Sequence, residues 1–254
     1  KIMRRFFTLC LAAIASITMI SAQQIVADGG LTSTKAPANT IAALEAAAKA
    51  GYAVKCDVNL AADGTIVVVE GPWLGEKGDP DRMNIQRSDY AMLSSKLLAN
   101  GEAVPTLDAY LDKVVELGDL HLIIEVKEHA TPQAESELAR AVVTKVKERK
   151  LQGRVDYQSM RQHICNELKR MAPSSAMVYY MGNNLTPEYV EGLGYSGICY
   201  TINTLKRIPR WFNEAHKLGL KVTVCGVANT EESAWAKKSG ADAIITTSPA
   251  TIKK

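Results

Sequence analysis

The strongest constraint on the fold is a repeated alternation of short apolar runs with segments of helical spacing, from residue 24 to residue 246. Alternating strands and helices indicate a parallel sheet. Eight or nine such units over about 230 residues favour a closed barrel over an open doubly wound sheet. We therefore expect an α/β fold, a single-domain (β/α)8 TIM barrel formed by residues 23–254.

The expected strands are 24–27, 52–58, 65–69, 121–126, 155–158, 176–180, 198–202, 222–225 and 242–246. The expected helices are 40–50, 107–117, 134–149, 160–171, 187–193, 206–218 and 231–239.

Nine strands are one too many for such a barrel. The surplus is 65–69, because the turn at Ala62-Asp63-Gly64 is too short for a parallel crossover. We expect this run to be a hairpin partner or an irregular barrel strand. Segment 72–90 lacks periodicity, and we expect a loop insertion over the barrel mouth.

The first residues have the layout of an export signal. Basic residues precede the apolar run 6–20, and Ser21-Ala22-Gln23 follows it. We expect a signal peptide over residues 1–22 and a periplasmic or secreted product with no membrane partner after cleavage, the alternative being a retained N-terminal anchor. The net charge of +3 comes partly from this segment, so it gives no basis for a nucleic-acid partner.

Two charged residues stand inside the apolar strand 52–58. Lys55 and Asp57 are two positions apart, so on a strand both point to the same face. An unpaired buried charge is costly, and such a pair is therefore a salt bridge, part of a metal site or a catalytic device. The next apolar run ends on Glu70.

Four further segments complete a recognisable order. They are Ala-Pro-Ala-Asn-Thr at 36–40, Cys-Asp-Val-Asn-Leu at 56–60 with Asp63-Gly64, Ile-Ile-Glu-Val-Lys at 123–127, and Gly-Ala-Asp-Ala-Ile-Ile-Thr at 240–246. Over the whole chain after the signal, this order resembles the glycerophosphodiester phosphodiesterase family of phosphoric diester hydrolases in lipid metabolism. The resemblance implies a TIM barrel in which two histidines act as acid and base and a divalent cation neutralises a phosphate.

The family's catalytic groups are replaced in this chain. Asp28-Gly29 stands where the family has His-Arg, Ala38 where it has Glu, Lys55 at a metal-binding Glu and Glu70 at the second His. The resemblance therefore implies that the inherited reaction is lost. An intact framework with new charges in the site favours deliberate redesign over drift.

Of the family's matched polar set, Asp57, Glu125 and Lys127 remain. These carboxylates are remnants of a metal site. Because Lys55 competes for the same space, we expect no bound Ca²⁺ or Mg²⁺ and no other cofactor.

Lys55 suggests a different chemistry. Desolvation in an apolar lumen would lower the pKa of its ammonium, and a neutral amine attacks carbonyls, as a Schiff-base lyase of the retro-aldol type requires. Glu70 or Asp28 would be the base for a small-molecule substrate. The expected substrate-binding residues are Trp73, Tyr157, Tyr180, Tyr200 and Lys127.

Other readings stay open. The carboxylates of Asp28, Asp57, Glu70 and Glu125 would raise the pKa of Lys55 if they surround it, leaving a structural ion pair. The barrel is then an inactive binder of a phosphate or small ligand, or it retains some phosphodiesterase activity. Glu70 or Asp28 alone could act as a general base. A Cys225 nucleophile is a weaker candidate, because neither His121 nor His129 sits clearly beside it.

Overall fold

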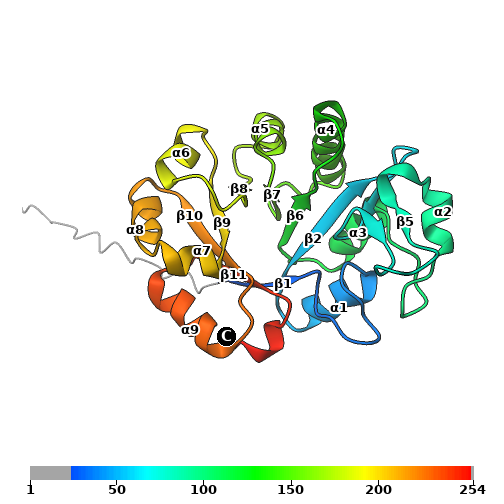
Figure 1. Cartoon of the computed structure of the whole chain (residues 1–254), viewed down its shortest axis with the longest axis horizontal. Helices are drawn as coiled ribbons and strands as arrows, with labels where there is room; N and C mark the ends of the chain where they lie inside the picture. Colours follow the sequence, from blue (N-terminus) through cyan, green and yellow to red (C-terminus); the bar gives the residue numbers. More distant parts are fainter. Residues whose placement is uncertain (1–23, 253–254) are drawn as a thin grey trace, which may run out of the picture.

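The computed structural model describes residues 24–252 (Figure 1). The expected signal peptide, 1–22, lies outside the described residues. No helix in the described part of the chain combines the length and the apolar character needed to cross a membrane.

Eight parallel strands form a closed barrel, which confirms the predicted fold class. The order around the sheet is β1-β11-β10-β9-β8-β7-β6-β2, and pairing of β1 with β2 closes it. The strands are β1 (Gln24–Asp28), β2 (Ala53–Leu60), β6 (Leu122–Val126), β7 (Val155–Ser159), β8 (Val178–Tyr180), β9 (Gly197–Thr201), β10 (Lys221–Cys225) and β11 (Ala243–Thr246).

Helices surround the strands (Figure 1). Many of them begin at a threonine whose hydroxyl accepts a backbone N–H of the first turn, as Thr40 does from Ala43. The larger helices and helical turns are α1 (Ile41–Lys49), α3 (Leu107–Glu116), α4 (Pro132–Glu148), α5 (Gln162–Met171), α6 (Pro187–Gly192), α7 (Ile202–Arg207), α8 (Arg210–Lys217), α9 (Thr230–Ser239) and η2 (Pro249–Thr251).

The single helix expected over 206–218 is instead two helices. α7 ends before Ile208, whose backbone leaves the helical region at φ −131° and ψ 63°. Pro209 follows, and a proline disfavours helical geometry in the residue before it. The break therefore follows from local stereochemistry.

The surplus strand is a hairpin partner, one of the two expected outcomes. β3 (Ile66–Val68) pairs antiparallel with the end of β2. The segment expected to be a loop insertion contains the small hairpin β4 (Trp73–Leu74) and β5 (Met83–Asn84), then η1 (Ile85–Arg87) and α2 (Tyr90–Ser95).

Strand β2 separates two environments. Val54, Cys56 and Val58 pack into the core between the sheet and the helices. Lys55 and Asp57 alternate with them and therefore face the lumen. Below them, an apolar lumen layer forms the floor: Val26, Ala53, Ile123, Tyr179, Cys199, Ala243 and Ile245.

Candidate functional site

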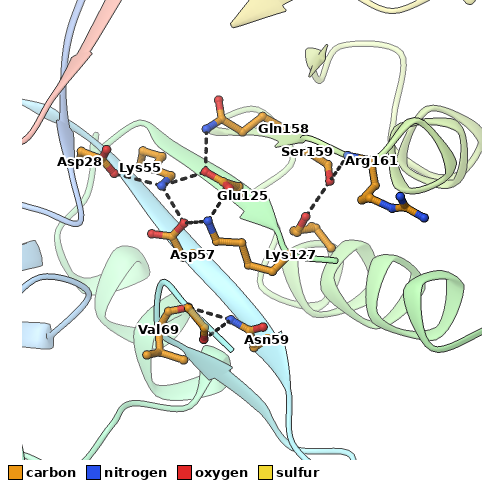
Figure 2. Close-up of polar contacts among 12 residues, drawn as sticks. Asp28, Lys55, Asp57, Asn59, Val69, Glu125, Lys127, Gln158, Ser159 and Arg161 are labelled. Atoms are coloured by element: carbon orange, nitrogen blue, oxygen red, sulfur yellow. Dashed lines mark hydrogen bonds and ion pairs between the residues drawn. The ribbon is translucent and has the colours of Figure 1, made fainter. Parts of the chain in front are cut away.

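The Lys55 ammonium lies in the lumen, between three carboxylates (Figure 2). Its Nζ is 3.0 Å from Asp28 Oδ1, 2.7 Å from Asp57 Oδ1 and 2.8 Å from Glu125 Oε2. These partners come from β1, β2 and β6, which are neighbours in the sheet. The Lys55 side chain is only 6% exposed, so the cluster is shielded from solvent.

A second cation and an amide complete the cluster. Lys127 Nζ is 2.7 Å from Asp57 Oδ1 and 2.5 Å from Glu125 Oε1. Asn39 donates to Asp57 Oδ2 at 3.0 Å and accepts from the Asp57 backbone N–H at 3.1 Å. Both oxygens of the Asp57 carboxylate are therefore satisfied.

The charges oppose the cost of burial. Burial alone would lower the pKa of Lys55, but Asp57, Glu125 and Asp28 outweigh it and hold the pKa well above its ordinary value. Burial would raise the pKa of Asp57, yet Lys55 and Lys127 keep it below its ordinary value. The three carboxylates around Nζ therefore favour a protonated Lys55, as the ion-pair alternative requires, over the expected neutral amine.

A cavity of about 750 Å³ opens above this cluster, toward the carboxyl ends of the strands. Ligand sites of TIM barrels lie at this end. The cavity is lined by Asn59, Glu70, Pro72, Gln86, Glu125, Val126, Lys127, Glu128, His129, Ala130, Ser159, Met160, Arg161, Gln162, Tyr180, Gly182 and Asn184.

Three of the predicted catalytic and substrate-binding residues line the cavity, as does the predicted remnant ligand Glu125. Glu70 is at the exposed edge, Lys127 extends from the buried cluster, and Tyr180 lies on the wall with its hydroxyl donating to Asn184 Oδ1 at 2.8 Å. Asp28 and Lys55 belong to the ion cluster and are not part of the cavity lining. Glu70 makes no ion pair with Lys55.

Three predicted aromatic residues lie elsewhere. Tyr157 and Tyr200 are fully buried in the core between the sheet and the helices. Trp73 is 42% exposed, with the Arg82 guanidinium 4.5 Å above its ring centroid. None of the three lines the cavity, so the structure gives no support to the prediction that they bind substrate.

Each of the four histidines has a hydrogen-bond partner within the described residues. His129 lines the cavity, but its Nε2 accepts the Leu60 N–H at 3.0 Å and its Nδ1 is 3.1 Å from the Lys127 carbonyl oxygen. These bonds require the neutral tautomer protonated on Nδ1. His121, the other candidate partner for Cys225, pairs with Asp156 at 3.0 Å.

Arg161 is the main cavity residue that sequence reasoning missed. It lies two residues beyond the end of β7, and its Nε donates to the buried Glu135 carboxylate at 3.1 Å. Within the described residues, its two terminal nitrogens have no hydrogen-bond partner. Its place just beyond a barrel strand was the available signal.

The lumen does not fit a divalent cation. A Ca²⁺ ion lies about 2.3–2.6 Å from its oxygen ligands. The position shared by the Asp28, Asp57 and Glu125 oxygens already contains the Lys55 ammonium, at 2.7–3.0 Å. Across residues 24–252, the lumen included, no group of three or more His, Cys, Asp or Glu side chains is arranged to hold a metal ion.

A closed barrel with charged groups at the carboxyl ends of its strands defines a TIM-barrel protein with an enzyme-like site. The model of the glycerophosphoryl diester phosphodiesterase family matches residues 32–251, and the chain belongs to that family.

Individual relatives agree with this membership. A curated glycerophosphodiester phosphodiesterase of Caldanaerobacter subterraneus subsp. tengcongensis is 27% identical over 232 residues, which is 87% of this chain and 92% of the relative. The crystal structure of a Parabacteroides distasonis glycerophosphodiester phosphodiesterase superposes with a TM-score of 0.84 at 32% identity, covering 90% of this chain and 94% of that one. An Oleispira antarctica phosphodiesterase has the same fold, with a TM-score of 0.76 at 21% identity over 89% of this chain and 93% of that one.

Proposed function

We propose that this barrel binds a small anionic ligand of the glycerol phosphate class and does not hydrolyse phosphodiesters. The observation that carries the proposal is the Lys55 ammonium, held by three carboxylates in the cluster beneath the cavity. The Lys55 ammonium takes the position that a divalent ion would need, and both ring nitrogens of His129, the histidine among the cavity-lining residues, are hydrogen-bonded.

The cavity offers positive groups to an anion. The free nitrogens of Arg161 and the ammonium of Lys127 are at its wall. A guanidinium with two free N–H-bearing nitrogens suits bidentate contact with a phosphate. The structure of the Oleispira antarctica phosphodiesterase is in complex with its product sn-glycerol-3-phosphate, which supports this ligand class.

Calorimetric titration with sn-glycerol 3-phosphate tests the binding. We expect saturable binding that weakens about tenfold or more in Arg161→Gln, since a charged hydrogen bond contributes roughly 1.5–3 kcal/mol. Glutamine keeps a donor for the buried Glu135. Arg170→Gln is the matched control, because Arg170 is exposed on α5 and pairs only with Glu167. Absence of binding in the wild type would refute the ligand class.

Hydrolysis is tested separately. Glycerophosphocholine incubated with the protein and Ca²⁺ or Mg²⁺ should release no glycerol phosphate above the rate of a buffer control. Cation-dependent turnover that Lys55→Met alters would show that the inherited reaction survives.

The geometry weighs against the retro-aldolase hypothesis. Three carboxylates stabilise the protonated amine, whereas Schiff-base formation needs the neutral one. Borohydride reduction with an aldehyde probe at neutral pH should leave Lys55 unmodified by mass spectrometry. A reduced adduct on Lys55 would restore that hypothesis.

A further inference from the structure

The contacts of Lys55 resemble the coordination of a metal ion more than an ordinary ion pair. An ammonium has three N–H donors. Lys55 has three carboxylate partners, one each from β1, β2 and β6, all within 3.0 Å of Nζ. Figure 2 shows these carboxylates converging on the nitrogen from different sides.

The three partners have the chemistry of ligands for a hard cation. Carboxylate oxygens are the preferred ligands of Ca²⁺ and Mg²⁺. The Asp57 and Glu125 side chains are 2% and 4% exposed, so they cannot turn to water when their counter-charge is removed. Gln158 adds a neutral amide 3.4 Å from Glu125 Oε2, and its own Oε1 is buried without a partner.

We propose that the Lys55 ammonium is a covalently tethered substitute for a divalent cation. The lumen is therefore independent of free cations in the wild-type protein. Shortening this one side chain opens a Ca²⁺ or Mg²⁺ site formed by Asp28, Asp57 and Glu125. Lys127 pairs with two of the same carboxylates and stays in place. This inference concerns the cation alone and does not depend on the proposed ligand.

Titration of Ca²⁺ into Lys55→Ala and Lys55→Glu, followed by calorimetry and thermal unfolding, tests the proposal. We expect both variants to bind one Ca²⁺ with a dissociation constant in the range of about 0.1–1 mM or below, and Lys55→Glu more tightly because it adds a carboxylate. With Ca²⁺ a hundredfold above that constant, the melting temperature should rise by about 5–10 °C. The wild-type melting temperature should be the same in EDTA and in Ca²⁺.

Two controls locate the site. Lys96→Ala removes a lysine that pairs with Asp79 outside the lumen, and it should create no Ca²⁺ response. Asp28→Asn added to Lys55→Ala should weaken Ca²⁺ binding about tenfold or more, because it removes one charged ligand. Asp28 is the most exposed of the three carboxylates, so this change disturbs the core least.

Each possible result of the Ca²⁺ titration either supports or overturns the proposal. If a variant is unfolded in EDTA, Ca²⁺ must restore its circular dichroism, because binding to the folded state contributes directly to folding. A folded variant that binds no Ca²⁺, a chain that stays unfolded with Ca²⁺ a hundredfold above the expected constant, or a wild-type protein stabilised by Ca²⁺ would each overturn the proposal.

Discussion

Lys55 is a buried charge whose surroundings decide its effect on stability. Replacing the whole cluster by apolar residues could leave the free energy of unfolding unchanged, because desolvating each ion costs several kcal/mol. Removing one member is different, because it leaves the remaining charges unpaired in the lumen. Asp57 and Glu125 are almost inaccessible to solvent, so they depend on their protein partners.

We expect Lys55→Met to lower the free energy of unfolding by about 3–5 kcal/mol, the usual cost of breaking a buried pair. Urea unfolding in EDTA measures it. Lys96→Met is the control: its pair with Asp79 is partly exposed and should contribute about 1 kcal/mol or less. Equal losses in the two variants would mean that burial of the cluster has no energetic consequence.

Stability should depend on pH through the same residues. The pKa of Asp57 is lowered in the folded state, so its contribution is complete above the unfolded value of about 3.9 and is lost as pH falls through the folded value. The pKa of Lys55 is raised, so its contribution is complete below about 10.4 and is lost as pH rises through the folded value.

Unfolding free energies of the wild type and of Lys55→Met between pH 2 and pH 7 check the acid limb. The difference in unfolding free energy between the two proteins should be constant above about pH 5. It should shrink below about pH 4, because the Asp57 carboxylate then gains a proton. A difference that does not change with pH would contradict the assignment.

At the scale of the elements, alternation of apolar and polar residues predicts the barrel, and it also predicts that Lys55 and Asp57 share a face. It does not predict the direction of the aromatic residues. Tyr200 lies in β9, a strand apolar on both faces, where a shift of one residue changes the face without any visible change in pattern. Tyr157 alternates with the polar residues Asp156 and Gln158 in β7, and its side of the strand packs against the helices.

The contacts of the cluster could not be predicted either. Whether Lys55 is neutral or protonated depends on which carboxylates reach its nitrogen, and Asp28 and Glu125 come from strands far apart in the sequence. Sequence reasoning therefore left both chemistries open. Arg161 was missed because a loop residue shows no periodicity.

Two glycines give a prediction for the elements themselves. A Cβ on Gly197 in β9 would lie 2.2 Å from the Lys221 carbonyl oxygen of β10, a backbone contact that only strand separation relieves. We expect Gly197→Ala to destabilise the protein by about 3 kcal/mol or more. Gly192 in α6 has open space around it, so Gly192→Ala should leave stability unchanged or raise it by about 0.5–1 kcal/mol. Guanidinium unfolding of both variants tests the contrast, and similar effects would contradict it.

At the scale of the whole molecule, the fold follows from family membership, whereas the chemistry of the site does not. The backbone follows the Parabacteroides distasonis enzyme with a TM-score of 0.84, while the lumen contains a lysine cation among three carboxylates. The apolar alternation of the strands determines the barrel, whereas a few side chains at the strand ends determine its chemistry. Family membership therefore fixes the architecture more firmly than the activity.

Closure of the barrel is the whole-molecule property that the lumen cluster requires. β11 lies between β1 and β10, and Ile245 is part of the apolar floor beneath the charges. Deleting residues 243–254 would leave two unpaired strand edges and open that floor to water, so we expect no cooperative thermal transition and aggregation in size-exclusion chromatography. The β4–β5 hairpin, in contrast, is a two-stranded sheet separate from the barrel. Replacing residues 76–81 by Gly-Gly should therefore lower the free energy of unfolding by about 1 kcal/mol or less. A cooperative transition in the truncated chain would show that the remaining strands hold the cluster without closure.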